Sequence, residues 1–188
     1  MLSQTEIIVL TLAIAADSFT TSWFSGALHH KLDIALDRKL PVFFAMGRLL
    51  FLVLGFGAGY YAATLFPYYS YLSGLSLLSV IGIKYGIESL KFYPEEKVIL
   101  IDNRKTILML SIAGSINTFI AGIAFGIAGI GLATPVVVII AAVAGFTYVG
   151  MIAGKVKGYR PSIRYVGLVS SISILAITLR LFVLNLIK

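Results

Sequence analysis

The sequence predicts an all-α integral membrane protein with six transmembrane helices in two inverted three-helix repeats. Three observations carry this prediction. Of the 188 residues, 59% are hydrophobic and 12% are charged, whereas soluble domains average about 25% charged residues. The apolar residues fall into six runs, each close to the roughly 20 residues that span a bilayer. Finally, a pattern in the first half of the chain recurs about 100 positions later.

The six apolar runs show no alternation of the kind that marks strands, and helices satisfy every backbone polar group within lipid. The runs cover residues 4–28, 41–66, 71–90, 106–130, 133–154 and 166–187. We expect a single membrane domain over 1–188, with one three-helix half at 1–92, a second at 104–188, and a cytoplasmic linker at 91–105.

The charge of the connections predicts the orientation. Eleven lysines and arginines lie in the connections 29–40, 91–105 and 155–165, and none lies in 66–71 or 129–135. Basic loops stay on the cytoplasmic side of a membrane, so both termini are expected outside. The net charge of +7 therefore reflects topology, and nucleic acid is not an expected partner.

The internal repeat emerges when Asp17 is aligned with Asn117. The same offset pairs Ala13 with Ala113, Ser18 with Thr118, Phe19 with Phe119 and Gly26 with Gly126, and a slightly different one pairs Gly55-x-x-x-Gly59 with Gly150-x-x-x-Gly154. Each half has three spans, an odd number, so the second half must be inserted upside down. Inverted repeats are typical of transporters, whose sites lie near the midplane where the repeats meet. The small-xxx-small pairs themselves indicate close helix packing.

Asp17 lies near the middle of the first run, where a charged residue costs about 2.5–3.5 kcal/mol on insertion scales. Its side chain is too short to reach the headgroups, so it should face the bundle interior and mark a functional site. Lys84 and Glu88 are four residues apart, which predicts an ion pair on one helix face. Arg180 is expected to extend to the outer interface. Arg48 could reach the cytoplasmic headgroups, but we predict that it contacts Asp17.

An oxygen-rich site is predicted where the repeats meet. Its expected ion- or substrate-binding residues are Asp17, Ser18, Thr21, Asn117 and Thr118, with Asp17 and Asn117 as metal ligands and Arg48, Lys84 and Glu88 as gating or charge-pair residues. Hard divalent cations such as Mg²⁺ and Mn²⁺ prefer oxygen ligands, although a proton relay or a plain hydrogen-bond network would suit the same residues.

Several functions are excluded or disfavoured. The chain has no cysteine, which removes disulfides and thiolate metal sites. No His/Glu pair or Ser/His arrangement lies within the apolar runs, and His29 and His30 are adjacent in a connection, where a solvated role is expected. We therefore expect neither an enzyme nor a resident cofactor.

Four segments resemble the MntP-type manganese exporters of the LysE-like superfamily: AADSFTTS, LGFGAG, GIKYGIESL and SINTFIAG. The resemblance implies six helices in two inverted halves and a divalent-cation efflux protein of the bacterial plasma membrane. It also implies a metal site at Asp17 and Ser18, and it matches Lys84 and Glu88 to a basic–acidic pair. Two positions depart from the pattern, because Asn117 replaces the family's second aspartate and Arg48 stands where the second helix often has an acid.

These departures leave three hypotheses. The first is a manganese or other divalent-cation exporter with a rebuilt site. The second is an exporter of a small amino acid or other organic solute on the same fold, recognised by Asp17, Arg48 and Asn117. The third is a membrane subunit or sensor that does not transport. In all three the bilayer is the surrounding partner, and neither the coupling ion nor the oligomeric state is predicted.

Overall fold

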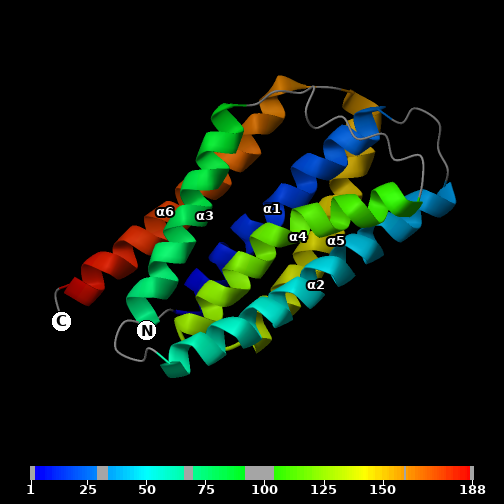
Figure 1. Ribbon diagram of the computed structural model, residues 1–188. Helices are drawn as coiled ribbons and strands as arrows, with labels where there is room; N and C mark the ends of the chain where they lie inside the picture. Colours follow the sequence, from blue (N-terminus) through cyan, green and yellow to red (C-terminus); the bar gives the residue numbers. More distant parts are fainter. Residues whose placement is uncertain (1–2, 29–33, 66–69, 92–103, 159, 187–188) are drawn as a thin grey trace.

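The computed structural model describes residues 3–28, 34–65, 70–91, 104–158 and 160–186 (Figure 1). Within these ranges the protein is all-helical. The helices are α1 (Gln4–Leu28), α2 (Ile34–Leu65), α3 (Ser70–Leu90), α4 (Arg104–Ile127), α5 (Ala133–Lys157) and α6 (Arg164–Leu186), the last preceded by a 3₁₀ turn at Pro161–Ile163. The predicted six-helix architecture is therefore confirmed.

Five of the helices contain a described stretch long and apolar enough to cross a membrane, with mean hydropathies between 1.2 and 2.4. The corresponding stretch of α4 is shorter and covers Gly114–Ile127. The whole of α4 has 24 residues, and at about 1.5 Å per residue this length matches the roughly 30 Å hydrocarbon core of a bilayer.

Two helices extend by three or more residues beyond the apolar runs that predicted them. Helix α2 begins at Ile34 instead of residue 41 and contains Pro41, which removes one backbone hydrogen bond without ending the helix. Helix α5 continues to Lys157 instead of residue 154 and has Lys155 and Lys157 in its last turn, where positive charge suits the helix dipole. A hydropathy pattern detects only the apolar part of a helix. It therefore misses helical turns that continue into polar sequence at either end.

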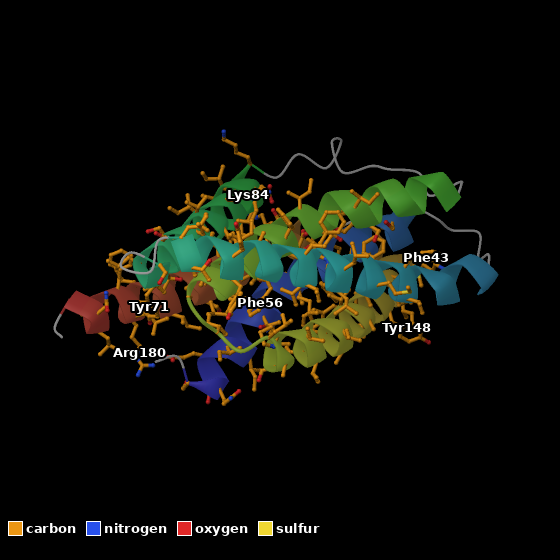
Figure 2. The ribbon with its side chains drawn as sticks, turned by 60° about the horizontal axis from the view of Figure 1, so that its bottom comes forward. Phe43, Phe56, Tyr71, Lys84, Tyr148 and Arg180 are labelled. Atoms are coloured by element: carbon orange, nitrogen blue, oxygen red, sulfur yellow. The ribbon has the colours of Figure 1, made fainter. Side chains whose placement is uncertain are left out.

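The first turn of α1 is held by a reciprocal cap. The backbone N–H of Glu6 donates to Ser3 Oγ at 3.2 Å, and the backbone N–H of Ser3 donates to Glu6 Oε2 at 2.8 Å, the arrangement of a capping box. Glu6 Oε1 also accepts a hydrogen bond from Arg180 Nη1 at 2.6 Å. Arg180 is on α6 and is labelled in Figure 2. Arg180 is exposed, and it has an ion-pair partner that the sequence did not suggest.

The helices pack as three pairs, α1 with α5, α2 with α4 and α3 with α6 (Figure 1). Each pair joins one helix from each half of the chain. The pair α3 and α6 lies to one side of the other four helices and reaches them mainly through α1 and α4.

Glycines bring the backbones of two of these pairs into contact. A Cβ atom added at any of four glycines would lie only 2.1–2.6 Å from a carbonyl oxygen of the facing helix. The pairs are Gly55 with Phe119, Gly59 with Ile123, Gly150 with Phe19 and Gly154 with Trp23. The α2–α4 contacts map onto the α5–α1 contacts by the offsets of the sequence alignment, which supports the inverted repeat that we propose.

Candidate ion-binding site

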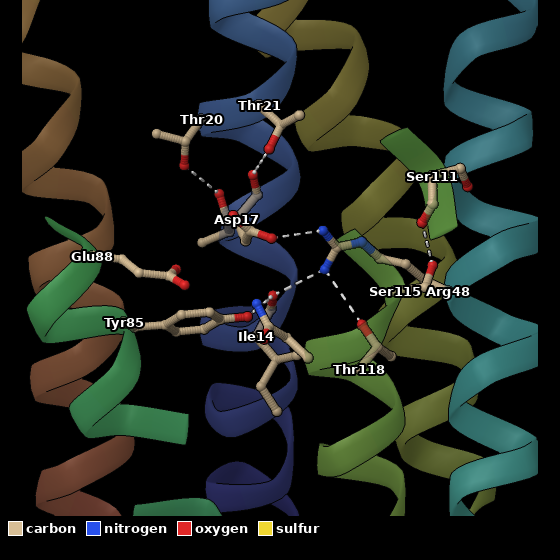
Figure 3. Close-up of polar contacts among 12 residues, drawn as sticks. Ile14, Asp17, Thr20, Thr21, Arg48, Tyr85, Glu88, Ser111, Ser115 and Thr118 are labelled. Carbon is tan, nitrogen blue, oxygen red and sulfur yellow. Dashed lines mark hydrogen bonds and ion pairs between the residues drawn. The ribbon is translucent and has the colours of Figure 1, made fainter. Parts of the chain in front are cut away.

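An ion pair between α1 and α2 lies at the centre of the bundle. Arg48 Nη2 donates to Asp17 Oδ2 at 3.0 Å (Figure 3). The side chain of Arg48 is 1% exposed and that of Asp17 is 18% exposed. The predicted contact is therefore present, and the alternative that Arg48 extends to the cytoplasmic headgroups is wrong for this conformation.

Arg48 also joins α2 to α4 and to the backbone of α1. Its Nη1 donates to Thr118 Oγ1 at 3.3 Å and to the carbonyl of Ile14 at 3.4 Å. Gly114 leaves room for the guanidinium, since a Cβ there would lie 3.0 Å from Nη2. The Nε of Arg48 is buried and has no partner among the described residues. A buried charge of this kind is strongly dependent on its partner, because removing one member of a buried pair leaves the other uncompensated.

A second charged group connects α3 to α4. Lys84 Nζ donates to Asn117 Oδ1 and lies 3.6 Å from Glu88 Oε1. The predicted pairing of Lys84 with Glu88 is confirmed, with each side chain 42% exposed. Asn117 itself is buried. Asp17 and Asn117, the two residues aligned by the repeat, are thus each in contact with a basic side chain.

The remaining predicted residues are placed differently. Thr118 belongs to the network through Arg48, whereas the hydroxyl of Thr21 donates to the backbone carbonyl of Asp17 at 3.0 Å. Ser18 is fully buried and its Oγ has no partner among the described residues. Adjacent residues of a helix point about 100° apart, so Ser18 does not share the face of Asp17, and no contact links it to the charged network.

A small cavity of about 20 Å³ lies beside Asp17, between α1, α3 and α6. Glu88 and Tyr85 extend from α3 toward Asp17 on the side opposite Arg48 (Figure 3). The residues that line the cavity are Asp17, Thr20, Tyr85, Glu88, Ser89, Arg164, Gly167 and Ser170.

Sequence reasoning missed most of these lining residues. Only Asp17 and Glu88 were among the candidate residues. Tyr85 lies three residues before Glu88 and four before Ser89, spacings that place neighbours on one side of a helix and were a usable signal. Nothing in the sequence connected the start of α6 to Asp17.

The site does not contain a conventional cluster of strong metal ligands. Among the described residues there is no group of three or more histidine, cysteine, aspartate and glutamate side chains that could hold a metal ion. A cation bound at Asp17 would therefore rely on amide, hydroxyl and backbone oxygens and on water, ligands that hard divalent cations accept.

Comparison with known proteins gives consistent matches. Residues 31–182 match the model of the family described as "Putative manganese efflux pump". The chain is 32% identical over 152 residues to the protein of Methanosarcina mazei named "Putative manganese efflux pump MntP", covering 81% of this chain and 79% of that one.

Two further relatives carry similar names. The Methanosarcina acetivorans protein is 29% identical, with the same shares of each chain covered, and a Clostridium botulinum protein is 24% identical over 81% of each chain. No solved structure matches. The range matched by the family model begins after α1, so the assignment of Asp17 depends on its sequence motif and its contacts. The chain is a multi-pass membrane protein that belongs to the MntP family of manganese efflux pumps, a transport family and not an enzyme family.

Proposed function

We propose that the protein exports a divalent cation such as Mn²⁺ from the cytoplasm, with Asp17 as the central carboxylate of the transport site. The observation that carries this proposal is the buried Asp17–Arg48 pair, which lies where α1, α2 and α4 meet. Membership of a manganese efflux family and the preference of Mn²⁺ for oxygen ligands support the choice of cargo.

Arg48 acts in this proposal as a gate that competes with the cation. Two unit charges 4 Å apart interact by about 4 kcal/mol at an effective dielectric constant near 20, and a divalent ion attracts Asp17 more strongly than a guanidinium does. When a cation takes Asp17, Arg48 keeps acceptors at Thr118 Oγ1 and the Ile14 carbonyl. A cation and Arg48 therefore compete for Asp17 Oδ2, the carboxylate oxygen that the guanidinium contacts.

Lys84 is a second basic residue at the proposed site, and it contacts α4. Asn117 is the counterpart of Asp17 in the proposed repeat and accepts a hydrogen bond from Lys84, which also lies beside Glu88. We infer that Asn117 and Thr118 contribute neutral oxygens to the site, and that Lys84 and Glu88 form a second charge pair at its edge.

The proposed orientation places both termini outside the plasma membrane. Introducing single cysteines tests it, because the chain has none of its own. Ser162 lies exposed between α5 and α6, and Gly131 lies exposed between α4 and α5. A membrane-impermeant thiol reagent added to intact cells should label Gly131→Cys and not Ser162→Cys. The reverse pattern would overturn the orientation.

Growth of a manganese-sensitive strain that lacks its own exporter tests the function. The wild-type protein should restore growth in high manganese, and Asp17→Asn, which removes only the charge, should not. If Asp17→Asn protects as well as the wild type, the carboxylate has no role in transport.

A small zwitterionic solute is the second candidate cargo. One observation favours it. The carboxylates of Asp17 and Glu88 both have a basic partner, so each pair offers a group of each charge to a solute that carries both charges. A wild-type protein that gives no protection against manganese, cobalt, cadmium or magnesium would reject cation export and favour the organic solute.

A further inference from the structure

The cavity beside Asp17 is lined by residues from three helices, most of which have an oxygen atom in the side chain. Asp17 and Thr20 come from α1, Tyr85, Glu88 and Ser89 from α3, and Ser170 from α6. Its volume of about 20 Å³ is enough for one water molecule, which needs roughly 10–15 Å³, or for one ion that has lost most of its hydration shell. The cavity is too small for an organic solute.

The hydroxyl groups of this cavity already donate their hydrogens to backbone carbonyls. Thr20, Ser89 and Ser170 each donate to the carbonyl four residues earlier in their own helix, at 3.3, 2.7 and 2.9 Å. Tyr85 donates across the interface to the Ile14 carbonyl at 3.3 Å. A hydroxyl oxygen retains acceptor lone pairs after donating its hydrogen, so all four groups can offer the cavity only an acceptor.

The two carboxylates complete an acceptor-rich lining. Asp17 Oδ2 is bonded to Arg48, but a carboxylate has about four lone-pair sites and can accept further partners. Glu88 Oε1 is 3.6 Å from Lys84, beyond ordinary hydrogen-bond range. An anion would need donors here, and the one basic side chain in the lining is that of Arg164, an exposed residue in the first turn of α6 whose guanidinium lies over the Tyr165 ring. The charge of Arg164 opposes a cation, but its exposed side chain can turn toward solvent, whereas the two carboxylates and the hydroxyl oxygens stay in place. With Arg164 turned away, the lining suits a cation.

We propose that this cavity is a cation subsite of the transport pathway, in which Asp17 and Glu88 supply charge and the hydroxyls of Thr20, Ser89 and Ser170 supply neutral oxygen ligands for a divalent ion. The inference rests on the proposed export function and gives α3 and α6 a direct part in binding. Arg164 belongs to the basic connection 155–165, which is cytoplasmic in the proposed orientation. The subsite is therefore the position that a cation reaches from the cytoplasm before it displaces Arg48 from Asp17.

Titration of Mn²⁺ into the purified, detergent-solubilised protein tests the subsite. Electron paramagnetic resonance measures the free aqueous ion, whose signal is lost on binding. The double variant Ser89→Ala/Ser170→Ala removes two neutral oxygens without changing the charge. Its affinity should fall about tenfold, the lower end of the loss seen when groups that support a metal site are removed.

The matched control is Ser76→Ala/Ser79→Ala. These two α3 serines make the same bond to the carbonyl four residues earlier, at 2.9 and 3.1 Å, but do not line the cavity. Their loss should leave Mn²⁺ affinity unchanged. A second variant, Ser170→Asp, adds a carboxylate to the lining and should raise the affinity for Mn²⁺. It tests the subsite even if the double variant fails to fold.

The outcomes separate the subsite from the export function. If the wild type binds Mn²⁺ and Asp17→Asn does not, but both cavity variants bind like the wild type, the subsite is overturned and the central site remains. If the wild type binds none of Mn²⁺, Co²⁺, Cd²⁺ and Mg²⁺, the export function and the subsite fail together.

Discussion

The α1–α5 and α2–α4 interfaces differ in kind from the α3–α6 interface. In the first two, glycines face the carbonyl oxygens of the partner helix. In the third, a Cβ added at Gly86 or Gly167 would meet the hydroxyls of Ser171 or Ser89, at 2.8 and 2.1 Å, and at Gly82 it would meet Leu175. A backbone atom can move only with its helix, whereas a side chain can change rotamer. The α1–α5 and α2–α4 pairs are therefore the rigid scaffold, and the α3–α6 pair can adjust.

The boundary between these two regions coincides with the cavity. Helix α3 is fixed to the scaffold near its first turns, where a Cβ at Gly74 would lie 2.8 Å from the Ala124 carbonyl of α4. Near its other end α3 meets α1 and α6 around the cavity, and it contacts α4 there through the side chains of Lys84 and Asn117. A polar cavity can therefore be retained next to tightly packed helices when the third pair packs through side chains.

The largest effect should come from filling a backbone contact of the scaffold. A Cβ at Gly154 would lie 2.1 Å from the Trp23 carbonyl. Overpacking typically costs about 1–3 kcal/mol, and the upper end is expected here because the two helix backbones would have to separate. Gly154→Ala should lower the thermal unfolding midpoint strongly. The fluorescence of Trp23, the single tryptophan, reports on this interface directly. The control is Gly145→Ala in the same helix, where nothing lies within 4 Å, and equal midpoints for the two variants would contradict the rigid scaffold.

The next effect concerns the ion pair inside the scaffold. Arg48→Gln removes the partner of Asp17 and the bonds to Thr118 and Ile14, which should destabilise the protein by about 2 kcal/mol, within the usual cost of leaving buried polar groups unpaired. The same variant should bind Mn²⁺ more tightly, because the carboxylate is no longer occupied. If unfolding and Mn²⁺ titration both match the wild type, the pair has no role as a gate.

Much of this arrangement was predictable from the sequence, because it depends on properties that repeat along a helix. Hydropathy located the six helices, and the four-residue spacing of Lys84 and Glu88 predicted their pair. The position of Asp17 in mid-membrane required a partner, and Arg48 was the basic residue placed to supply it. Each of these inferences rests on the sequence pattern of a single helix or on the high free-energy cost of burying an unpaired charge.

The unpredicted features depend on how helices far apart in the chain are oriented about their axes. Ser170 comes near Asp17 only because α6 packs beside α1 and α3, and no local pattern encodes that rotation. Ser18 shows the opposite error, because proximity to Asp17 in the sequence does not give it the same helix face. The partner of Arg180 was missed for the same reason, since Glu6 is 174 residues away.

A smaller effect is expected where the adjustable pair is filled. A Cβ at Gly86 would lie 2.8 Å from Ser171 Oγ, which donates to the Gly82 carbonyl at 2.8 Å. The serine can rotate away at the cost of that hydrogen bond, worth about 1 kcal/mol, and alanine recovers part of this through its helix propensity. Gly86→Ala should therefore change stability by less than about 1 kcal/mol. A loss as large as that of Gly154→Ala would show that the α3–α6 pair is as rigid as the scaffold.

The smallest effect should follow from removing the link between α6 and the start of α1. The Arg180–Glu6 pair is short, at 2.6 Å, but Arg180 is 67% exposed, and exposed ion pairs contribute only about 0.2–1 kcal/mol because water and salt screen them. Glu6 also keeps its bond to the Ser3 backbone when the arginine is lost. Arg180→Gln should thus shift the unfolding midpoint slightly, and the shift should vanish when the wild type and the variant are compared in high salt. A large shift that salt does not reduce would mean that this pair fixes α6 to α1, and the adjustable region would then be restricted to the end of the α3–α6 pair that surrounds the cavity.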